Sequence, residues 1–287
     1  MHENHSGQEH RRQSARPIKP YMHNQSPMHI LLALDSFKGC LTSEEVEAAF
    51  ARALTARGAD VSSLPLSDGG EGMLQAFTAA LHGQTIEVEV HDPLMRPVTA
   101  RYGLAPDGTA IIESAQACGL TLIPAAERNP LTATSYGVGE LVAHAARRGC
   151  RRFIIGLGGS GTSDAGRGML RGLTDTLAPG GAIDEVIHNM LGGCRFVLAC
   201  DVRNPLYGPE GAAHVFAPQK GATPDMVDEL DRRARHFAEL SARRMGWDAS
   251  TRPGRPAGWD TPFCNICRLP WNPVPTCCLT SPVLTTS

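Results

Sequence analysis

The sequence is short of aromatic residues, of net charge and of long apolar runs, and each shortage excludes a class of protein. Aromatic residues are 5% of the 287-residue chain, and the formal net charge is −2. Proteins that bind nucleic acid usually carry a basic surface with aromatic side chains on which bases stack, so nucleic acid is not an expected partner. No apolar run is long enough to span a bilayer, and residues 1–28 lack the apolar stretch of a signal peptide, so no membrane partner is expected either.

Cysteines are present in an odd number, nine, and are scattered along the chain. Cys118, Cys194 and Cys200 lie in apolar stretches and are interpreted as buried thiols, which fits a reducing, cytoplasmic compartment. The motif CNIC at 264–267, followed by CC at 277–278, has some zinc-like spacing and leaves a zinc-binding interaction module open as one hypothesis.

The first part of the chain alternates strands and helices after a polar, proline-rich extension over 1–27 that is expected to be disordered. In the first helix Thr42 and Glu45 match a capping box, and Val46, Phe50 and Leu54 share one face. This order predicts a parallel α/β layer over 28–84. The expected elements are a strand over 29–34, a helix over 42–57, a strand over 60–66 and a helix through Met73, Phe77 and Leu81.

The second part mixes strands and helices without regular alternation, which predicts an α+β domain over 85–250. After about residue 251 the sequence loses periodicity, and the stretch 251–287 is expected to be an aberrant, disordered tail. The elements expected in the second part are a β-meander over 85–93 and 98–114, a helix over 139–148, strands over 152–155 and 194–201, and a helix that Thr223 and Pro224 open and that ends near Met245.

Polar, glycine-bearing loops follow several of these strands. In the stretch LDSFKG, Asp35, Ser36 and Lys38 come between the first strand and the first helix, where α/β sheets collect ligands and a helix N-terminus attracts anions. The loop SDGGEG repeats the arrangement after the second strand. Its candidate residues are Asp68, Gly69, Gly70 and Glu71.

The densest glycine stretch, GLGGSGTSDAG at 156–166, follows a strand and precedes a helix, a context that favours phosphate or carboxylate binding by backbone amides. It matches neither the Walker pattern nor a dinucleotide fingerprint. Its candidate residues are Gly158, Gly159, Ser160, Thr162 and Asp164. Two further polar loops add Arg128, Asp201, Gln219 and Lys220 as candidates.

Together these stretches resemble the bacterial type of glycerate kinase, glycerate kinase type 1. Five stretches are similar to family motifs and occur in the same order. They are ALDSFKGCLTSEEV, SDGGEG, IESAQACGLTLIPAAERNPLTATSYGVGEL, IIGLGGSGTSDAGRGML and ACDVRNPLYGPEGAAHVFAPQKGAT. The resemblance implies a partial flavodoxin-like parallel α/β domain with an inserted restriction-enzyme-like α+β domain. It also implies transfer of the γ-phosphoryl group of ATP to D-glycerate, giving 2-phosphoglycerate in most bacterial members or 3-phosphoglycerate.

The resemblance also suggests roles for the candidates. Lys38 and Mg²⁺ would offset charge on the transferred group, with the metal ligands left unknown. Asp35 or Asp201 would accept the proton of the glycerate hydroxyl. Arg128 would bind the glycerate carboxylate, which its fork fits. The other candidates would bind substrate or phosphate.

The sequence departs from the family pattern in three places. Ser163 and Ala165 replace the usual asparagine and glycine, and the chain between Leu173 and Cys194 is shorter than usual. The codons of 256–261, read in another frame, can encode a family-like Ala-Gly-Gly-Met-Gly-Tyr, so a truncated chain with a frameshifted tail from about residue 255 is expected. A non-catalytic ligand-binding or regulatory remnant of the kinase is therefore the alternative function.

Overall fold

The computed structural model describes residues 28–35, 37, 40–64, 66–67, 69–200, 202 and 204–245. The expectations for the extension over 1–27 and for the tail over 251–287 lie outside the described residues. Within the described residues the chain forms a mixed α/β fold that includes parallel strands, in agreement with the predicted class. None of its described helices combines the length and the apolar character that crossing a membrane requires.

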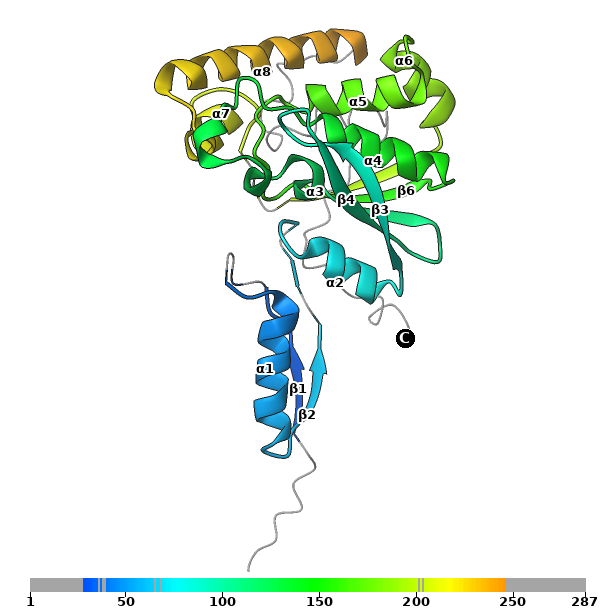
Figure 1. The fold of residues 1–287 in the computed structure, drawn as a ribbon, viewed down its shortest axis with the longest axis vertical. Coiled ribbons are helices and arrows are strands. Elements are labelled where there is room, and N and C mark those ends of the chain that lie inside the picture. The colour runs from blue at the N-terminus through cyan, green and yellow to red at the C-terminus, as the bar shows by residue number, and fades with distance from the viewer. Residues whose placement is uncertain are drawn as a thin grey trace, which may run out of the picture.

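The first part of the chain forms a two-stranded parallel sheet covered by one helix (Figure 1). β1 (His29–Leu32) pairs with β2 (Asp60–Ser63), and α1 (Ser43–Thr55) connects them. The predicted capping box is present, because Thr42 accepts a hydrogen bond from the N–H of Glu45 and the Glu45 carboxylate accepts one from the N–H of Thr42. The parallel α/β layer expected from the alternation is therefore confirmed.

The apolar stripe predicted for α1 is only partly buried. Val46 is 4% exposed, whereas Phe50 is 52% exposed, and Leu31 on β1 is also exposed. The reason is that the sheet beside α1 has only two strands, which is too narrow to cover the whole apolar face of the helix. The buried face of α1 instead includes two polar residues, Ser43 and Glu47.

The second part is built on a five-stranded sheet whose strands lie in the order of the chain. β3 to β5 are antiparallel, which confirms the predicted meander, and β6 and β7 continue the sheet in parallel with β5. The strands are β3 (Gln84–His91), β4 (Pro97–Leu104), β5 (Thr109–Glu113), β6 (Arg152–Gly156) and β7 (Arg195–Ala199).

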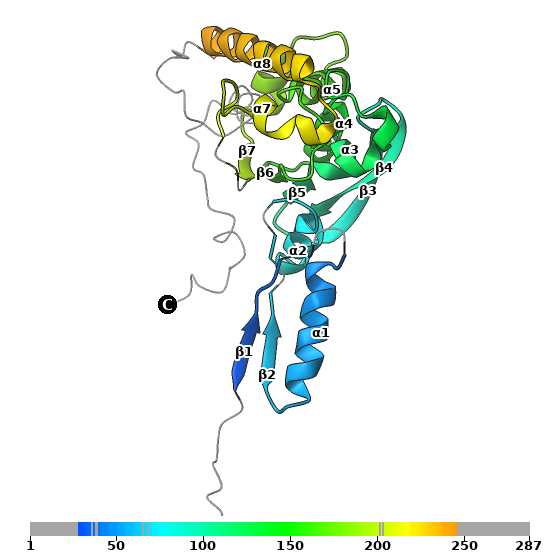
Figure 2. The same cartoon turned by 90° about the vertical axis from the view of Figure 1, so that its left-hand side faces the viewer.

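Helices cover both faces of this larger sheet. α2 (Met73–Ala80) packs Met73 and Phe77 on one face, against Ile111. α4 (Tyr136–Arg147) and α5 (Arg167–Leu177) pack on the opposite face, where the main core lies. In Figures 1 and 2, α2 lies between the larger sheet and the two-stranded sheet.

The remaining helices are mostly short. They are α3 (Ala115–Cys118), η1 (Leu120–Leu122), η2 (Ala125–Glu127), α6 (Ile183–Glu185), η3 (Val186–Met190), α7 (Ala212–Phe216), η4 (Pro218–Lys220) and the long α8 (Pro224–Met245). Some follow β5 or β7, whereas α6 and η3 lie between α5 and the start of β7. α8 begins at the residue predicted from Thr223 and Pro224. Cys118 and Cys194 are buried as predicted, but Cys200 is only half-buried because it follows β7 and lines a cavity.

Candidate functional site

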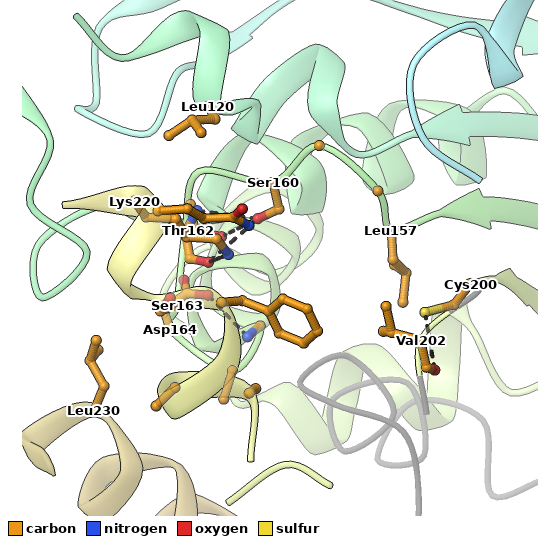
Figure 3. Close-up of a pocket in the computed structure, with 18 of the residues that line it drawn as sticks. Leu120, Leu157, Ser160, Thr162, Ser163, Asp164, Cys200, Val202, Lys220 and Leu230 are labelled. Carbon is orange, nitrogen blue, oxygen red and sulfur yellow. Dashed lines mark hydrogen bonds between the residues drawn. The ribbon is translucent and has the colours of Figure 1, made fainter. Parts of the chain in front are cut away.

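A cavity of about 510 Å³ lies beyond the carboxyl ends of β6 and β7 (Figure 3). Loops at that end of a parallel sheet are where α/β proteins collect ligands, and the volume suits a small molecule. The lining residues come from loop 70–71, from η1, from loop 157–166, from the stretch after β7, and from α7, η4 and α8.

Two of the predicted glycine loops meet at this cavity. The N–H of Gly158 donates to the carbonyl of Gly69 at 3.0 Å. A Cβ on Gly158 would overlap the backbone of Gly70, and a Cβ on Gly69 would overlap the Ala199 carbonyl. The chain therefore needs glycine at these positions because backbone packs directly on backbone, which brings SDGGEG and GLGGSG into one site.

The second of these loops offers free backbone donors. The N–H groups of Gly159, Ser160 and Ser163 make no hydrogen bond within the described part of the chain. Gly159 has a φ of 73°, in the left-handed region. Unpaired N–H groups in a glycine-rich turn are a typical binding site for a phosphate or carboxylate.

Lys220 adds a positive charge to the same cavity. It is 9% exposed, and its Nζ donates to the Thr162 carbonyl at 2.6 Å. Burial lowers the pKa of Lys220 to about 8, against the opposing effect of Cys118 and Asp164. Lysine occurs in the whole sequence only at Lys19, Lys38 and Lys220, so this ammonium is the one lysine charge among the described residues.

Small polar groups hold the backbone beneath Lys220 in place. The hydroxyls of Ser160 and Thr162 lie 2.9 Å apart, and the N–H of Thr162 donates to Ser160 Oγ at 3.2 Å. Cys118 Sγ lies 3.8 Å from the same Ser160 hydroxyl. Burial raises the pKa of the Cys118 thiol to about 11, so it is a neutral packing group at physiological pH.

The carboxylate of Asp164 is fully engaged by the protein itself. It accepts hydrogen bonds from the N–H and hydroxyl of Ser135 and from the N–H groups of Gly166 and Gly168. The last two amides lie at the start of α5, where a negative charge is favourable. Asp164 therefore joins α4, α5 and the glycine loop, and it lines the cavity as a structural group.

An apolar wall, which the motif reading did not identify, lies across the cavity from the glycine loop. Its side chains come from the stretch after β7, from α7 and from α8, and Figure 3 shows Val202 and Leu230 among them. In the sequence, this wall is indicated only by the short, mostly apolar run AAHVF at 212–216, between two polar loops. The wall comprises Val202, Leu206, Ala212, Ala213, Phe216, Leu230 and Ala234.

The structure brings together many but not all of the predicted site residues. Those that line the cavity are Gly70, Glu71, Gly158, Gly159, Ser160, Thr162, Asp164, Gln219 and Lys220. Gly69 packs directly behind them. Ser36, Lys38, Asp68 and Asp201 lie outside the described residues.

Asp35 and Arg128 do not line the cavity. Asp35 is exposed beyond the end of β1. Arg128 is half-buried, and its Nε is buried without a hydrogen-bond partner. A Cβ built on Gly221 would lie 3.0 Å from the Cβ of Arg128, which places Arg128 beside the residue that follows Lys220. The predicted roles of these residues remain predictions.

The described residues contain no group of three or more metal-ligating side chains. Among the carboxylates that line the cavity, Asp164 is engaged as above, whereas Glu71 is exposed. A magnesium ion commonly needs only one or two carboxylates when a substrate phosphate supplies further ligands. Glu71 therefore fits as a protein ligand for a metal that arrives with phosphate.

Comparison with known proteins gives consistent matches to one group. Residues 30–261 match the Glycerate kinase family. The chain is 43% identical over 238 residues to the glycerate kinase of Bacillus subtilis (strain 168), covering 76% of this chain and 62% of the relative. It is 39% identical over 246 residues to the glycerate 2-kinase of Escherichia coli (strain K12), covering 79% of this chain and 65% of the relative.

A solved structure agrees with these matches. The crystal structure of a protein assigned as glycerate kinase 2 from Salmonella typhimurium LT2 superimposes with a TM-score of 0.70 at 38% identity. The match covers 85% of this chain and 71% of that structure. The chain spans less than two thirds of the length of the Bacillus and Escherichia relatives.

Proposed function

This chain belongs to the glycerate kinase family, and we propose that it transfers the γ-phosphoryl group of ATP to D-glycerate, giving 2-phosphoglycerate or 3-phosphoglycerate. The observation that carries the proposal is the cavity in which Lys220 and the unpaired N–H groups of the glycine loop converge. Phosphoryl transfer requires mainly positioning and neutralisation of charge on the phosphate oxygens. A buried ammonium and fixed backbone donors supply that neutralisation in a site of low dielectric.

The remaining chemistry is assigned to residues around this cavity. Asp201 is the first candidate to accept the proton of the glycerate hydroxyl, as the family resemblance suggests. Asp35 is the second candidate for that role. Mg²⁺, when bound with ATP, supplies further positive charge at the phosphates, and Glu71 is the described residue that would hold it.

Arg128 is proposed to bind the glycerate carboxylate. Its guanidinium presents a planar fork that matches a carboxylate, and the buried Nε lacks a partner in the described part of the chain. Its position beside Gly221 keeps it close to Lys220. Since glycerate carries both a carboxylate and the accepting hydroxyl, a cation near the phosphate site would orient that hydroxyl.

The two sheets fit a two-domain arrangement. We assign 28–84 to a partial flavodoxin-like domain and 85–250 to an inserted restriction-enzyme-like domain, with support from the separate parallel pair and five-stranded sheet. The five described cysteines, all free, support a cytoplasmic location.

The test is an assay of ADP formation by the full chain with ATP, Mg²⁺ and D-glycerate, together with identification of the product by mass spectrometry. We expect glycerate-dependent ADP formation that falls at least about a hundredfold in Lys220→Met, since removal of a fixed electrostatic group has that effect in other enzymes. Binding of ATP and glycerate without any ADP formation would instead favour the non-catalytic remnant.

A further inference from the structure

The apolar wall of the cavity has no use in the transfer reaction itself. Glycerate and the triphosphate are small, polar and charged, so their recognition requires donors and cations. Phe216 is half-buried, and Val202 is also only partly buried, so both leave apolar surface at the cavity. Apolar surface left in contact with water is unfavourable, and its presence in a cavity indicates a ligand with an apolar part.

The wall is built as a preformed surface. Ala213 and Ala217 of the α7 region pack against Val227 and Leu230 of α8 in a small core of their own. Phe216 lies on the same short helix and lines the cavity. A surface fixed in this way can bind a flat ring without first being ordered.

The same segment carries both kinds of recognition group. Lys220 lies four residues after Phe216, on η4 directly after α7. Its Nζ reaches across to the Thr162 carbonyl of the opposite loop, so it joins the apolar wall to the glycine loop (Figure 3). A single ligand that fills the cavity would therefore contact apolar side chains with one of its ends, and the Lys220 ammonium and backbone N–H donors with the other.

We infer that the wall formed by α7, the start of α8 and the stretch after β7 binds the base and ribose of the nucleotide, while loop 158–163 and Lys220 bind its phosphates. A nucleoside triphosphate has this combination of a flat, largely apolar ring and a chain of anionic groups. Aromatic side chains stack on any base through its π-face. The inference rests on the proposed function, because it takes ATP to be the phosphoryl donor.

The experiment separates the two parts of the ligand. Binding of ATP and of inorganic tripolyphosphate to the full chain is measured by isothermal titration calorimetry for wild type, Phe216→Ala and Lys220→Met. Phe216→Ala is expected to lower the affinity for ATP about tenfold, since stacking of a base on one aromatic ring contributes about that much. The affinity for tripolyphosphate, which has no base, is expected to change less than about twofold. Lys220→Met is expected to lower the affinity for both ATP and tripolyphosphate.

The neighbouring residue on α7 provides a matched control. Val215 is 46% exposed and does not line the cavity, so Val215→Ala should bind both ligands as wild type does. A second variant, Ala212→Phe, fills the wall and should reduce ATP binding while tripolyphosphate still binds. Circular dichroism spectra of all variants confirm that they fold.

Three results would each overturn the inference. Phe216→Ala could lose the same affinity for ATP and for tripolyphosphate, both wall variants could keep the wild-type affinity for ATP, or the wild type could fail to bind ATP. If the wall variants keep the wild-type affinity for ATP and still phosphorylate glycerate, the wall does not bind the base, and the proposed activity stands. Separable base and phosphate binding without phosphorylation of glycerate would support the inference and reject the proposed activity.

Discussion

The carboxylate of Glu47 accepts a hydrogen bond from the N–H of Leu34 at 2.9 Å, although Glu47 lies on a helix and is only 1% exposed. One turn earlier on α1, the hydroxyl of Ser43 donates to the carbonyl of Leu66 at 3.1 Å. Leu34 directly precedes the stretch DSFKG, and Leu66 precedes SDGGEG. Two polar residues on one helix therefore hold the starts of two candidate loops at a fixed separation.

Replacement of Glu47 tests this connection. Glu47→Ala should lower the free energy of unfolding by about 2 kcal/mol, because it leaves the partly buried N–H of Leu34 unpaired. Glu47→Gln should retain most of the stability, since its amide oxygen can accept the same hydrogen bond and burial already raises the pKa of the Glu47 carboxyl. Urea unfolding measures both.

Glu44 provides the control for Glu47, because it is exposed on the same helix. Glu44→Ala should change the free energy of unfolding by less than about 0.5 kcal/mol. Hydrogen exchange at the Leu34 amide should accelerate in Glu47→Ala and remain slow in Glu47→Gln; equal acceleration in both variants would contradict the assigned contact.

Gly158→Ala should damage the candidate site directly. The added Cβ would overlap backbone atoms of Gly70, which cannot rotate away, so the two glycine loops must separate. We expect a loss of about 2 kcal/mol in the free energy of unfolding together with weaker ATP binding. Thermal unfolding and calorimetry measure the two effects.

Gly193→Ala is the matched control, because a Cβ at Gly193 meets no atom within 4 Å. Its stability and its ATP affinity should match those of wild type. Wild-type stability and binding in Gly158→Ala would show that the loops do not pack as described.

Asp164→Ala should be among the more destabilising substitutions near the cavity. It removes the acceptor for Ser135, Gly166 and Gly168 at once, and we expect a loss of about 3 kcal/mol in the free energy of unfolding. Asp164→Asn keeps one acceptor oxygen, so its free energy of unfolding should decrease less than that of Asp164→Ala. Asp228→Asn serves as the control, because the Asp228 side chain is 81% exposed.

The charge of Lys220 predicts a pH dependence of nucleotide binding. Burial lowers the pKa of Lys220 to about 8, so the free protein carries this charge at pH 7 and loses it as the pH rises through 8 toward the ordinary value of 10.5. ATP stays fully ionised over this range, because secondary phosphate groups have a pKa near 6. ATP affinity measured by calorimetry should therefore decrease between about pH 7.5 and 9.5.

Lys220→Arg separates this effect from other titrations. Arginine stays charged over the whole range, so the affinity of the variant for ATP should change little with pH. A decrease of the same size in Lys220→Arg and in wild type would assign the pH dependence to another group.

Local signals in the sequence predicted much of the fold. The capping box at Thr42 and Glu45, the β-meander over 85–114 and the start of α8 at Pro224 depend on neighbouring residues, and the structure confirms them. The exposure of Phe50 was not predictable, because helix periodicity shows that a face is apolar but not whether a partner covers it.

The candidate site was predictable to a similar extent. Glycine loops after strands can be read from the sequence. The meeting of Gly69 with Gly158 cannot, because the two loops follow strands of different sheets, β2 and β6, and no local pattern encodes the contact. The apolar wall was missed because α7 is only five residues long, too short to show periodicity. The partnering of Asp164 with Ser135 joins residues 29 apart in the chain, and no local pattern encodes it.

The strand order of the larger sheet has a consequence for synthesis on the ribosome. Because β3 to β7 lie in space in the order in which they are made, each strand meets an edge that earlier residues have already formed. No strand waits for a later one before it can pair, which keeps aggregation-prone edges exposed only briefly. The cavity depends on residues after β7, on α7 and on α8, so the nascent chain completes the described five-stranded sheet before it forms the cavity.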